Sequence, residues 1–156
     1  MPAITPFLWF HDNAEEAANF YVSVFPNSKI LSVNRYGDAG PGPKGSVMAV
    51  SFDLDGRQFT ALNGGPRYTF TPAVSFLVPC ETQQEVDYYW DKLIAGGKPS
   101  QCGWLEDKYG LSWQIVPKAL FRLMQDKDSA KSQRVMKAML QMVKLDVAQL
   151  QQAANE

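Results

Sequence analysis

Residues 8–21 (LWFHDNAEEAANFY) and residues 76–89 (FLVPCETQQEVDYY) follow the same pattern at a constant offset of 68 positions. Each stretch starts with an apolar run typical of a strand, turns through a short corner and continues with apolar residues at helical spacing. The alignment pairs Phe20-Tyr21 with Tyr88-Tyr89. An internal repeat of this kind indicates a duplicated structural unit more strongly than any single motif does.

Strand-like segments follow both predicted helices. Residues 28–36 and 47–54 flank the loop GDAGPGPKG, and Asp55-Gly56 is a hairpin signal before a returning strand at 58–63. In the second half, GWLEDKYGLSWQIVP (103–117) has the pattern of a hairpin that Gly110 closes. We therefore predict an α+β fold of two βαβββ repeats, at about residues 4–65 and 73–117, with first strands at 4–10 and 73–78 and helices at 14–25 and 83–95.

Side chains that can cap helices precede three predicted helices. Asn13 and Glu16 have the spacing of an N-cap and its partner, and Thr82 and Glu85 form a second capping box. Asp146 can cap a last short helix, VAQLQQA.

We assign the paired repeats to a domain of residues 1–118. Residues 119–156 are predicted to form a C-terminal helical extension. Helices are expected at 119–124 and 129–144. The second carries an apolar side of Val135, Met136, Met139, Met142 and Val143. Because a monomer would leave this stripe exposed, we predict a homodimer that buries it. The alternative is a tail that folds back over its own sheet.

Composition and charge exclude several classes of protein. Of the 156 residues, 46% are hydrophobic and 20% are charged, as in a globular domain. The formal net charge of −1 gives no attraction to nucleic acid or to an anionic membrane. The chain has no apolar run of membrane-spanning length, no signal-peptide pattern at its N-terminus, and no CxxC or disulfide-framework spacing between Cys80 and Cys102. We therefore predict a cytoplasmic protein with reduced thiols, no nucleic-acid partner and no membrane association.

Four strings together carry a family resemblance: FHDNAEEAANFYVSVFPNS, FTALNGGP, AVSFLVPC and GWLEDKYGLSWQIVP. They resemble the PhnB-like branch of the vicinal-oxygen-chelate superfamily, which includes glyoxalase I, bleomycin-resistance proteins and extradiol dioxygenases. The branch is filed under the name 3-demethylubiquinone-9 3-methyltransferase. The resemblance runs from about Ile4 to Pro117, and it implies that the two repeats curl around a shared cleft.

The resemblance also implies metal ligands, typically His, Glu or Gln, on the first and last strand of each repeat. Carried onto this chain, these positions are Thr5, Ala73 and Gln114, with Thr60 as the fourth, or Phe59 in a register one residue different. Hydroxyl, methyl and amide groups offer a divalent cation neither carboxylate nor imidazole. We therefore predict no metal and no cofactor, and we assign no catalytic residue.

Strand alternation places Thr5, Phe7 and Trp9 on one face of the first strand, opposite Leu8 and Phe10. The first face is expected to line the implied cleft, whereas Leu8, Phe10, Phe76, Trp113 and Ile115 are expected to pack against helices. The predicted ligand-binding residues are Thr5, Phe7, Trp9, Thr60, Leu62, Ser75, Trp104 and Gln114. Such a cleft suits an uncharged or aromatic small molecule, unless its own side chains fill it.

Several single residues have two interpretations. Gln114 is either a hydrogen-bonding group that faces the ligand or a buried amide satisfied by a neighbouring hydroxyl. His11, the one histidine, is either a general base or a surface or capping residue. Glu106-Asp107-Lys108 is predicted to be a solvated turn, and Gly64-Gly65 lacks the following helix of a phosphate loop.

Three functions are compatible with this pattern. The first is a metal-free protein that binds a small molecule. The second is a metal-dependent glyoxalase- or dioxygenase-type enzyme with an atypical site. The third is the methyltransferase that the family label names, which would need a glycine-rich strand-to-helix loop for its cofactor, and the chain shows no such loop on a βαβ unit.

Overall fold

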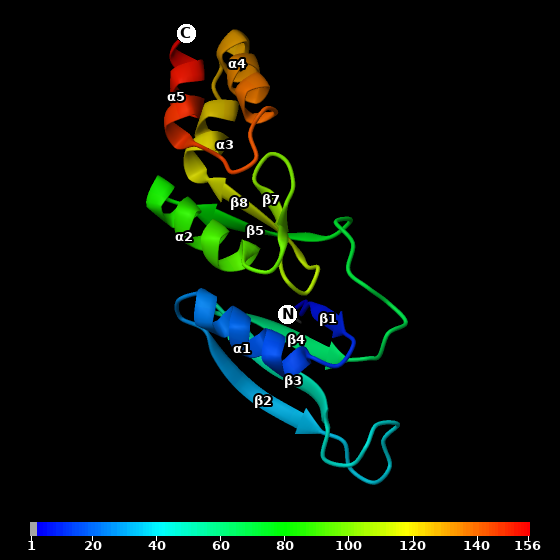
Figure 1. The fold of residues 1–156 in the computed structure, drawn as a ribbon. Helices are drawn as coiled ribbons and strands as arrows, with labels where there is room; N and C mark the ends of the chain where they lie inside the picture. Colours follow the sequence, from blue (N-terminus) through cyan, green and yellow to red (C-terminus); the bar gives the residue numbers. More distant parts are fainter. Residues whose placement is uncertain (1–2) are drawn as a thin grey trace. The chain divides into compact units, whose positions relative to one another are not determined.

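The computed structural model describes residues 3–156 and divides the chain into two compact units, Met1–Phe70 and Thr71–Glu156. Each unit contains a four-stranded mixed sheet, and a helix crosses one face of that sheet (Figure 1).

In unit 1, a parallel strand pair adjoins an antiparallel meander. The strand order is β1-β4-β3-β2, with β1 and β4 parallel and the other pairs antiparallel. The elements are β1 (Phe7–Phe10), α1 (Ala14–Val24), β2 (Lys29–Arg35), β3 (Val47–Leu54) and β4 (Arg57–Asn63).

Unit 2 repeats this topology and adds three helices. The strand order β5-β8-β7-β6 again has its first pair parallel and the others antiparallel, which confirms the predicted duplication. The elements are β5 (Ser75–Cys80), α2 (Gln83–Ile94), β6 (Lys98–Pro99), β7 (Trp104–Glu106), β8 (Ser112–Pro117), α3 (Lys118–Met124), α4 (Ser129–Met139) and α5 (Val147–Asn155).

Strand alternation divides each sheet into a helix-covered face and an opposite face, as predicted. In unit 1, the rings of Tyr21, Phe52 and Phe59 stack in sequence between α1 and the sheet, with centroid distances of 6.3 and 5.7 Å. Of the residues predicted to pack against helices, Leu8, Phe10, Trp113 and Ile115 are buried, and Phe76 is half-buried against Trp113. Because Phe59 lies on this covered face, the register that would have turned it toward a cleft is wrong.

One predicted helix cap forms differently. The side chain of Asn13 makes no cap hydrogen bond. Instead, Asn63 at the end of β4 accepts a hydrogen bond from the Ala14 N–H through Oδ1 (2.8 Å). The other two caps are confirmed, because Thr82 accepts from the Glu85 N–H and Asp146 accepts from the Gln149 N–H.

The predicted solvated turn at residues 106–108 is correct for Lys108, which is exposed, but wrong for Asp107. Asp107 is 3% exposed, and its carboxylate accepts hydrogen bonds from the backbone N–H groups of Tyr109 (2.8 Å) and Leu111 (3.1 Å). Its second oxygen accepts from Nε1 of Trp113 at 2.9 Å. A buried carboxylate needs such donors to offset its lost hydration, so Asp107 organises the β7–β8 turn from inside.

The C-terminal helices bury part of the apolar stripe within unit 2. α4 ends at Met139 rather than at residue 144, and the chain then turns so that Met142 enters the same small core as Val135. Figure 1 shows α3, α4 and α5 gathered beyond the end of β8. The core consists of Val116, Leu120, Leu123, Val135, Met142, Leu145, Leu150 and Ala154.

The expectation that a monomer would expose this stripe is therefore wrong for Val135, which is fully buried, and for Met142, which is 8% exposed, whereas Met136 and Met139 are half-buried. Of the stripe, Val143 stays substantially exposed (42%). The homodimer itself stays a prediction, which the mass of the protein in solution will test. No helix within residues 3–156 has both the length and the apolar character needed to cross a membrane.

Candidate functional site

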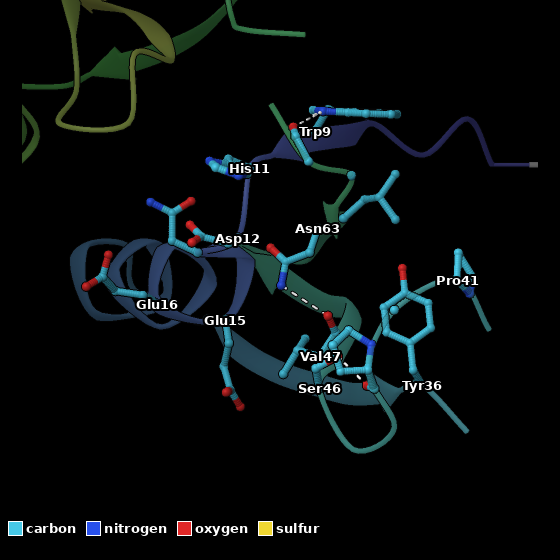
Figure 2. A pocket seen from close by; sticks show the side chains of 16 residues that line it. Trp9, His11, Asp12, Glu15, Glu16, Tyr36, Pro41, Ser46, Val47 and Asn63 are labelled. Carbon is cyan, nitrogen blue, oxygen red and sulfur yellow. Dashed lines mark hydrogen bonds between the residues drawn. The ribbon is translucent and has the colours of Figure 1, made fainter. Parts of the chain in front are cut away.

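Unit 1 contains a cavity of about 1000 Å³ between the end of β1, the start of α1 and the loop that joins β2 to β3 (Figure 2). Its lining is drawn from segments that the sheet brings together. The lining residues are Trp9, His11, Asp12, Asn13, Glu15, Glu16, Tyr36, Pro41, Gly42, Pro43, Ser46, Val47, Leu62, Asn63, Gly64 and Gly65.

Trp9 forms one wall and is held in position on two sides. Its Nε1 donates a hydrogen bond to the Gly65 carbonyl oxygen (3.0 Å), and its ring meets Tyr68 edge-on with centroids 5.0 Å apart. Gly64 lies against the indole so closely that a Cβ there would approach a ring carbon to 2.3 Å. The glycine is therefore required for this packing, and the indole presents a fixed apolar surface.

Tyr36 forms a second wall within the glycine- and proline-rich loop. A Cβ added at Gly40 or Gly42 would come within 2.4 Å of its ring, so the loop wraps the tyrosine closely. The loop is closed by paired backbone hydrogen bonds, from Tyr36 N–H to Ser46 O (2.9 Å) and from Gly45 N–H to Tyr36 O (2.8 Å). This loop is thus an ordered element that holds an aromatic ring at the cavity.

Asn63 links the base of the cavity to the start of α1. Its Nδ2 donates to the Val47 carbonyl at 3.1 Å, while its Oδ1 accepts from Ala14 as described above. Figure 2 shows Asn63 between the acidic start of α1 and the Val47 strand. Because both ends of the amide are engaged, Asn63 serves to fix the geometry of the site.

The ionic side chains that line the cavity are mostly acidic. Asp12, Glu15 and Glu16 lie at the corner and first turn of α1, together with His11. Arg35 approaches Glu15 with a separation of 3.7 Å between Nη2 and Oε2, and both side chains are about half exposed. Such an exposed pair is weak, so much of the negative character of the rim persists.

The predicted ligand-binding residues of unit 1 share one sheet face, and two of them line the cavity. Phe7 is paired with Thr60 and Trp9 with Leu62 across the β1–β4 ladder, which places all four on the face opposite α1. Trp9 and Leu62 line the cavity, whereas Thr5, Phe7 and Thr60 lie outside its lining. Phe7 is 66% exposed and Thr60 is buried.

The predicted residues of unit 2 form a separate polar group on its own sheet. Gln114 is paired with Leu77 on one side and Trp104 on the other. Its Nε2 donates a hydrogen bond to Oγ of Ser75 at 2.9 Å. A neighbouring hydroxyl was one of the two interpretations of Gln114, and this bond shows the amide nitrogen engaged with the hydroxyl of Ser75.

Strand pairing changes the counterpart of Gln114 in the first repeat. Gln114 lies opposite Leu77, which corresponds to Trp9 at the repeat offset, and Trp9 lies opposite Leu62. The counterpart is therefore Leu62 rather than Thr60. Alignment on the two turn glycines misplaced it because Leu54 and Arg57 flank a two-residue turn, whereas the turn from Glu106 to Ser112 is longer.

The donor groups do not fit the divalent metal that the superfamily resemblance implies. The four positions carry Thr5, Leu62, Ala73 and Gln114, which supply one hydroxyl and one amide but no anionic or imidazole ligand. Within residues 3–156 there is also no cluster of three or more His, Cys, Asp or Glu side chains placed to hold a metal ion. No step is therefore derived through a metal.

The described residues offer neither a cofactor loop for a methyltransferase nor a reactive thiol at Cys80. The corners that lead into α1 and α2 contain His11-Asp12-Asn13 and Glu81-Thr82, without the glycines of a nucleotide-binding loop. Burial, followed by the nearby charge of Glu85, raises the pKa of the Cys80 thiol to about 12, which keeps it protonated and unreactive.

Sequence reasoning missed several residues that shape the cavity: Tyr36, Asn63, Gly64 and the acidic start of α1. The two glycines before Pro66 were correctly separated from phosphate loops, but their contact with Trp9 depends on a chain reversal that no local pattern reveals. The alternating glycines and prolines after Tyr36 were the sequence signal that could have identified this wall, since glycine often marks a close approach of the backbone to another group.

The duplicated βαβββ topology and its two mixed sheets define a protein of the vicinal-oxygen-chelate class. A family model described as 3-demethylubiquinone-9 3-methyltransferase matches residues 2–116. The chain therefore belongs to this family, the PhnB-like branch of the superfamily, as the sequence resemblance predicted. Helices α3 to α5 lie beyond the matched residues.

Solved structures agree with this assignment. A PhnB protein from Bacillus cereus is 41% identical, with 74% of this chain and 99% of that chain covered and a TM-score of 0.68. A protein from Pseudomonas aeruginosa (19% identity, 75% and 98% coverage, TM-score 0.64) and the fosfomycin resistance protein FosX from Listeria monocytogenes (16%, 75% and 93%, 0.51) share the fold alone. A comparison with curated proteins finds no match.

Proposed function

We propose that this protein binds a small aromatic or apolar molecule without a metal ion, and that Trp9 and Leu62 contact the ligand. The observation that carries the proposal is the cavity of about 1000 Å³, which has two aromatic walls held in place by glycines. A largely preformed hollow with apolar walls and a few polar groups is the usual form of a small-molecule site.

Rigid aromatic walls favour binding because little side-chain freedom is lost when the ligand enters. Trp9 is fixed by Gly65, Tyr68 and Gly64, and Tyr36 is fixed by its own loop. The remaining predicted residues, Thr5, Phe7, Thr60, Ser75, Trp104 and Gln114, lie outside the lining of this cavity, and their contact with a ligand stays a prediction apart from this proposal. The donor groups at the superfamily's metal positions give the alternative metal-dependent enzyme no comparable support.

Isothermal titration with 2-(1-naphthyl)ethanol, a neutral aromatic probe, tests the proposal. We expect saturable binding that weakens at least about tenfold in Trp9→Ala, because a stacked aromatic contact and its buried area are lost. Tyr36→Ala is a second variant, which removes the opposite wall and leaves the β1–β4 ladder intact. Thermal unfolding confirms that each variant is folded.

Trp104→Ala is the matched control for loss of a tryptophan. An affinity unchanged in Trp104→Ala but reduced in both cavity variants places the site in unit 1 and supports the proposal. If the probe binds equally well to the wild type, Trp9→Ala and Tyr36→Ala, or binds none of them, the proposal is refuted.

A further inference from the structure

The cavity in unit 1 is asymmetric in charge. Among the described residues that line it, three are carboxylates (Asp12, Glu15 and Glu16) and one is an imidazole (His11), and none is Lys or Arg. All four come from the corner and first turn that lead into α1, so they lie on one side of the rim (Figure 2).

The neighbouring positive groups offset only part of this charge. Arg35 reaches one carboxylate, that of Glu15, at 3.7 Å with solvent-exposed partners. The N-terminus of α1 adds a partial positive charge of about one half, which falls off within the first helical turn. With the full Arg35 charge included, the rim still carries net negative charge, and this would disfavour an anionic ligand.

The opposite walls are aromatic. Trp9 and Tyr36 line the cavity, and the faces of such aromatic rings are electron-rich and attract a cation. Sites that bind organic amines commonly combine aromatic rings with carboxylates. Asn63 is fixed in position, because its Nδ2 donates to the Val47 carbonyl and its Oδ1 accepts from the Ala14 N–H. The geometry combines an apolar floor, aromatic walls and an acidic rim.

From this combination we infer that the ligand of the cavity is an organic amine, with a positively charged nitrogen at the rim near Asp12 and Glu16 and an aromatic or apolar body against Trp9. The inference rests on the proposed function and goes beyond it by naming the charge of the ligand.

Three probes that share a naphthyl group and differ in charge test the inference by isothermal titration at pH 7. They are 2-(1-naphthyl)ethylamine (cation), 2-(1-naphthyl)ethanol (neutral) and 1-naphthaleneacetate (anion). We expect the amine to bind about threefold to tenfold more tightly than the alcohol, and the carboxylate to bind most weakly. The difference between amine and alcohol should shrink at high salt, because the rim is exposed.

The variant Asp12→Asn/Glu16→Gln removes two rim charges and preserves side-chain size. We expect it to bring the affinity for the amine close to that for the alcohol. The matched control, Asp91→Asn/Glu156→Gln, removes two exposed charges from unit 2 and should leave the preference unchanged.

The outcomes separate the inference from the proposed function. If the alcohol binds through Trp9 as tightly as the amine, or if the carboxylate binds most tightly, the inference fails and the proposed function stands. If the preference for the amine survives in the rim variant, the inference also fails. If no probe binds the wild type, both fail together.

Discussion

At the scale of single residues, Trp9 and Tyr36 owe their fixed positions to neighbours that lack a side chain. Gly64 lies under the indole, and Gly40 and Gly42 flank the phenol ring. In unit 2, the single buried carboxylate of Asp107 organises a turn by accepting three hydrogen bonds. Close contacts of this kind are intolerant of added volume.

Gly64→Ala tests the Trp9 contact. The new Cβ would lie 2.3 Å from the indole, so the ring must shift and its hydrogen bond to Gly65 must weaken. We expect a loss of about 2 kcal/mol in the free energy of unfolding, measured by urea denaturation, and a changed tryptophan emission spectrum.

Gly37→Ala is the matched control, because a Cβ at Gly37 would meet no atom within 4 Å. Its unfolding free energy should stay within about 0.5 kcal/mol of the wild type. Equal stability of the two variants would contradict the packing described for Trp9.

At the scale of elements, α3, α4 and α5 are integral to unit 2. Gln83, at the start of α2, donates to the Leu145 carbonyl (3.1 Å) and accepts from the Val147 N–H (2.7 Å). Nearby, the ammonium group of Lys144 pairs with Asp87 at 2.9 Å. Hydrogen bonds from Lys144 and then Gln83 lower the pKa of Asp87 below its ordinary value. Asp87 therefore stabilises the folded protein at a pH above its unfolded pKa, and this stabilisation is lost as the pH falls and acid protonates the carboxyl group.

Gln83→Ala tests the attachment of the tail. The substitution removes the hydrogen bonds to Leu145 and to Val147, the first residue of α5, together with one to Asp87 within α2, while alanine favours the helical backbone of α2. We expect a loss of about 1–3 kcal/mol in unfolding free energy and faster amide hydrogen exchange in α5.

Gln84→Ala is the neighbouring control, since the Gln84 side chain is exposed and lies in the same helical turn. It should change neither the unfolding free energy nor the exchange rates. Similar effects of the two substitutions would show that Gln83 does not anchor the tail.

Local sequence patterns predicted the helices and strands. The features that these patterns missed depend on contacts between residues far apart in the sequence. The 2.0 and 3.6 periodicities placed Leu8, Trp9 and Ile115 on the correct sheet faces. The Ala14 cap could not be predicted locally, because its acceptor Asn63 lies 49 residues away. The counterpart of Gln114 was misplaced because turn length, not glycine position, sets the pairing register.

At the scale of the whole molecule, the chain combines a family fold with side chains at the superfamily's metal positions that do not suit a divalent cation. His11 is the one histidine in 156 residues, and it lies at the exposed corner before α1. The carboxylates of the cavity come from one segment rather than from opposing strands. Within residues 3–156 no group of three or more His, Cys, Asp or Glu side chains is placed to hold a metal ion, so we expect little response to divalent ions.

Addition of Zn²⁺, Ni²⁺, Mn²⁺ or Fe²⁺, each compared with EDTA-treated protein, tests this conclusion by thermal unfolding. A specific site occupied at a hundredfold excess over its Kd adds about 2.7 kcal/mol and would raise Tm by several degrees. We expect a shift below about 1 °C for each ion.

His11→Gln controls for weak surface binding through the single imidazole. A shift that persists in this variant, accompanied by stoichiometric metal in the purified protein, would restore the metal-dependent enzyme as the leading function.

The backbone contact between the start of β7 and the segment after α4 has a consequence for biosynthesis. Cys102 and Gly103 donate hydrogen bonds to the carbonyls of Met142 and Val143 (2.9 and 2.8 Å), and a Cβ on Gly103 would collide with Leu145. The segment at the start of β7 is thus held by residues some 40 positions later in the chain, whereas the contacts within unit 1 lie within the first 70 residues. During synthesis, the N-terminal unit can fold while the chain is still growing, but the C-terminal unit can complete its fold only after residues 142–145 have been made.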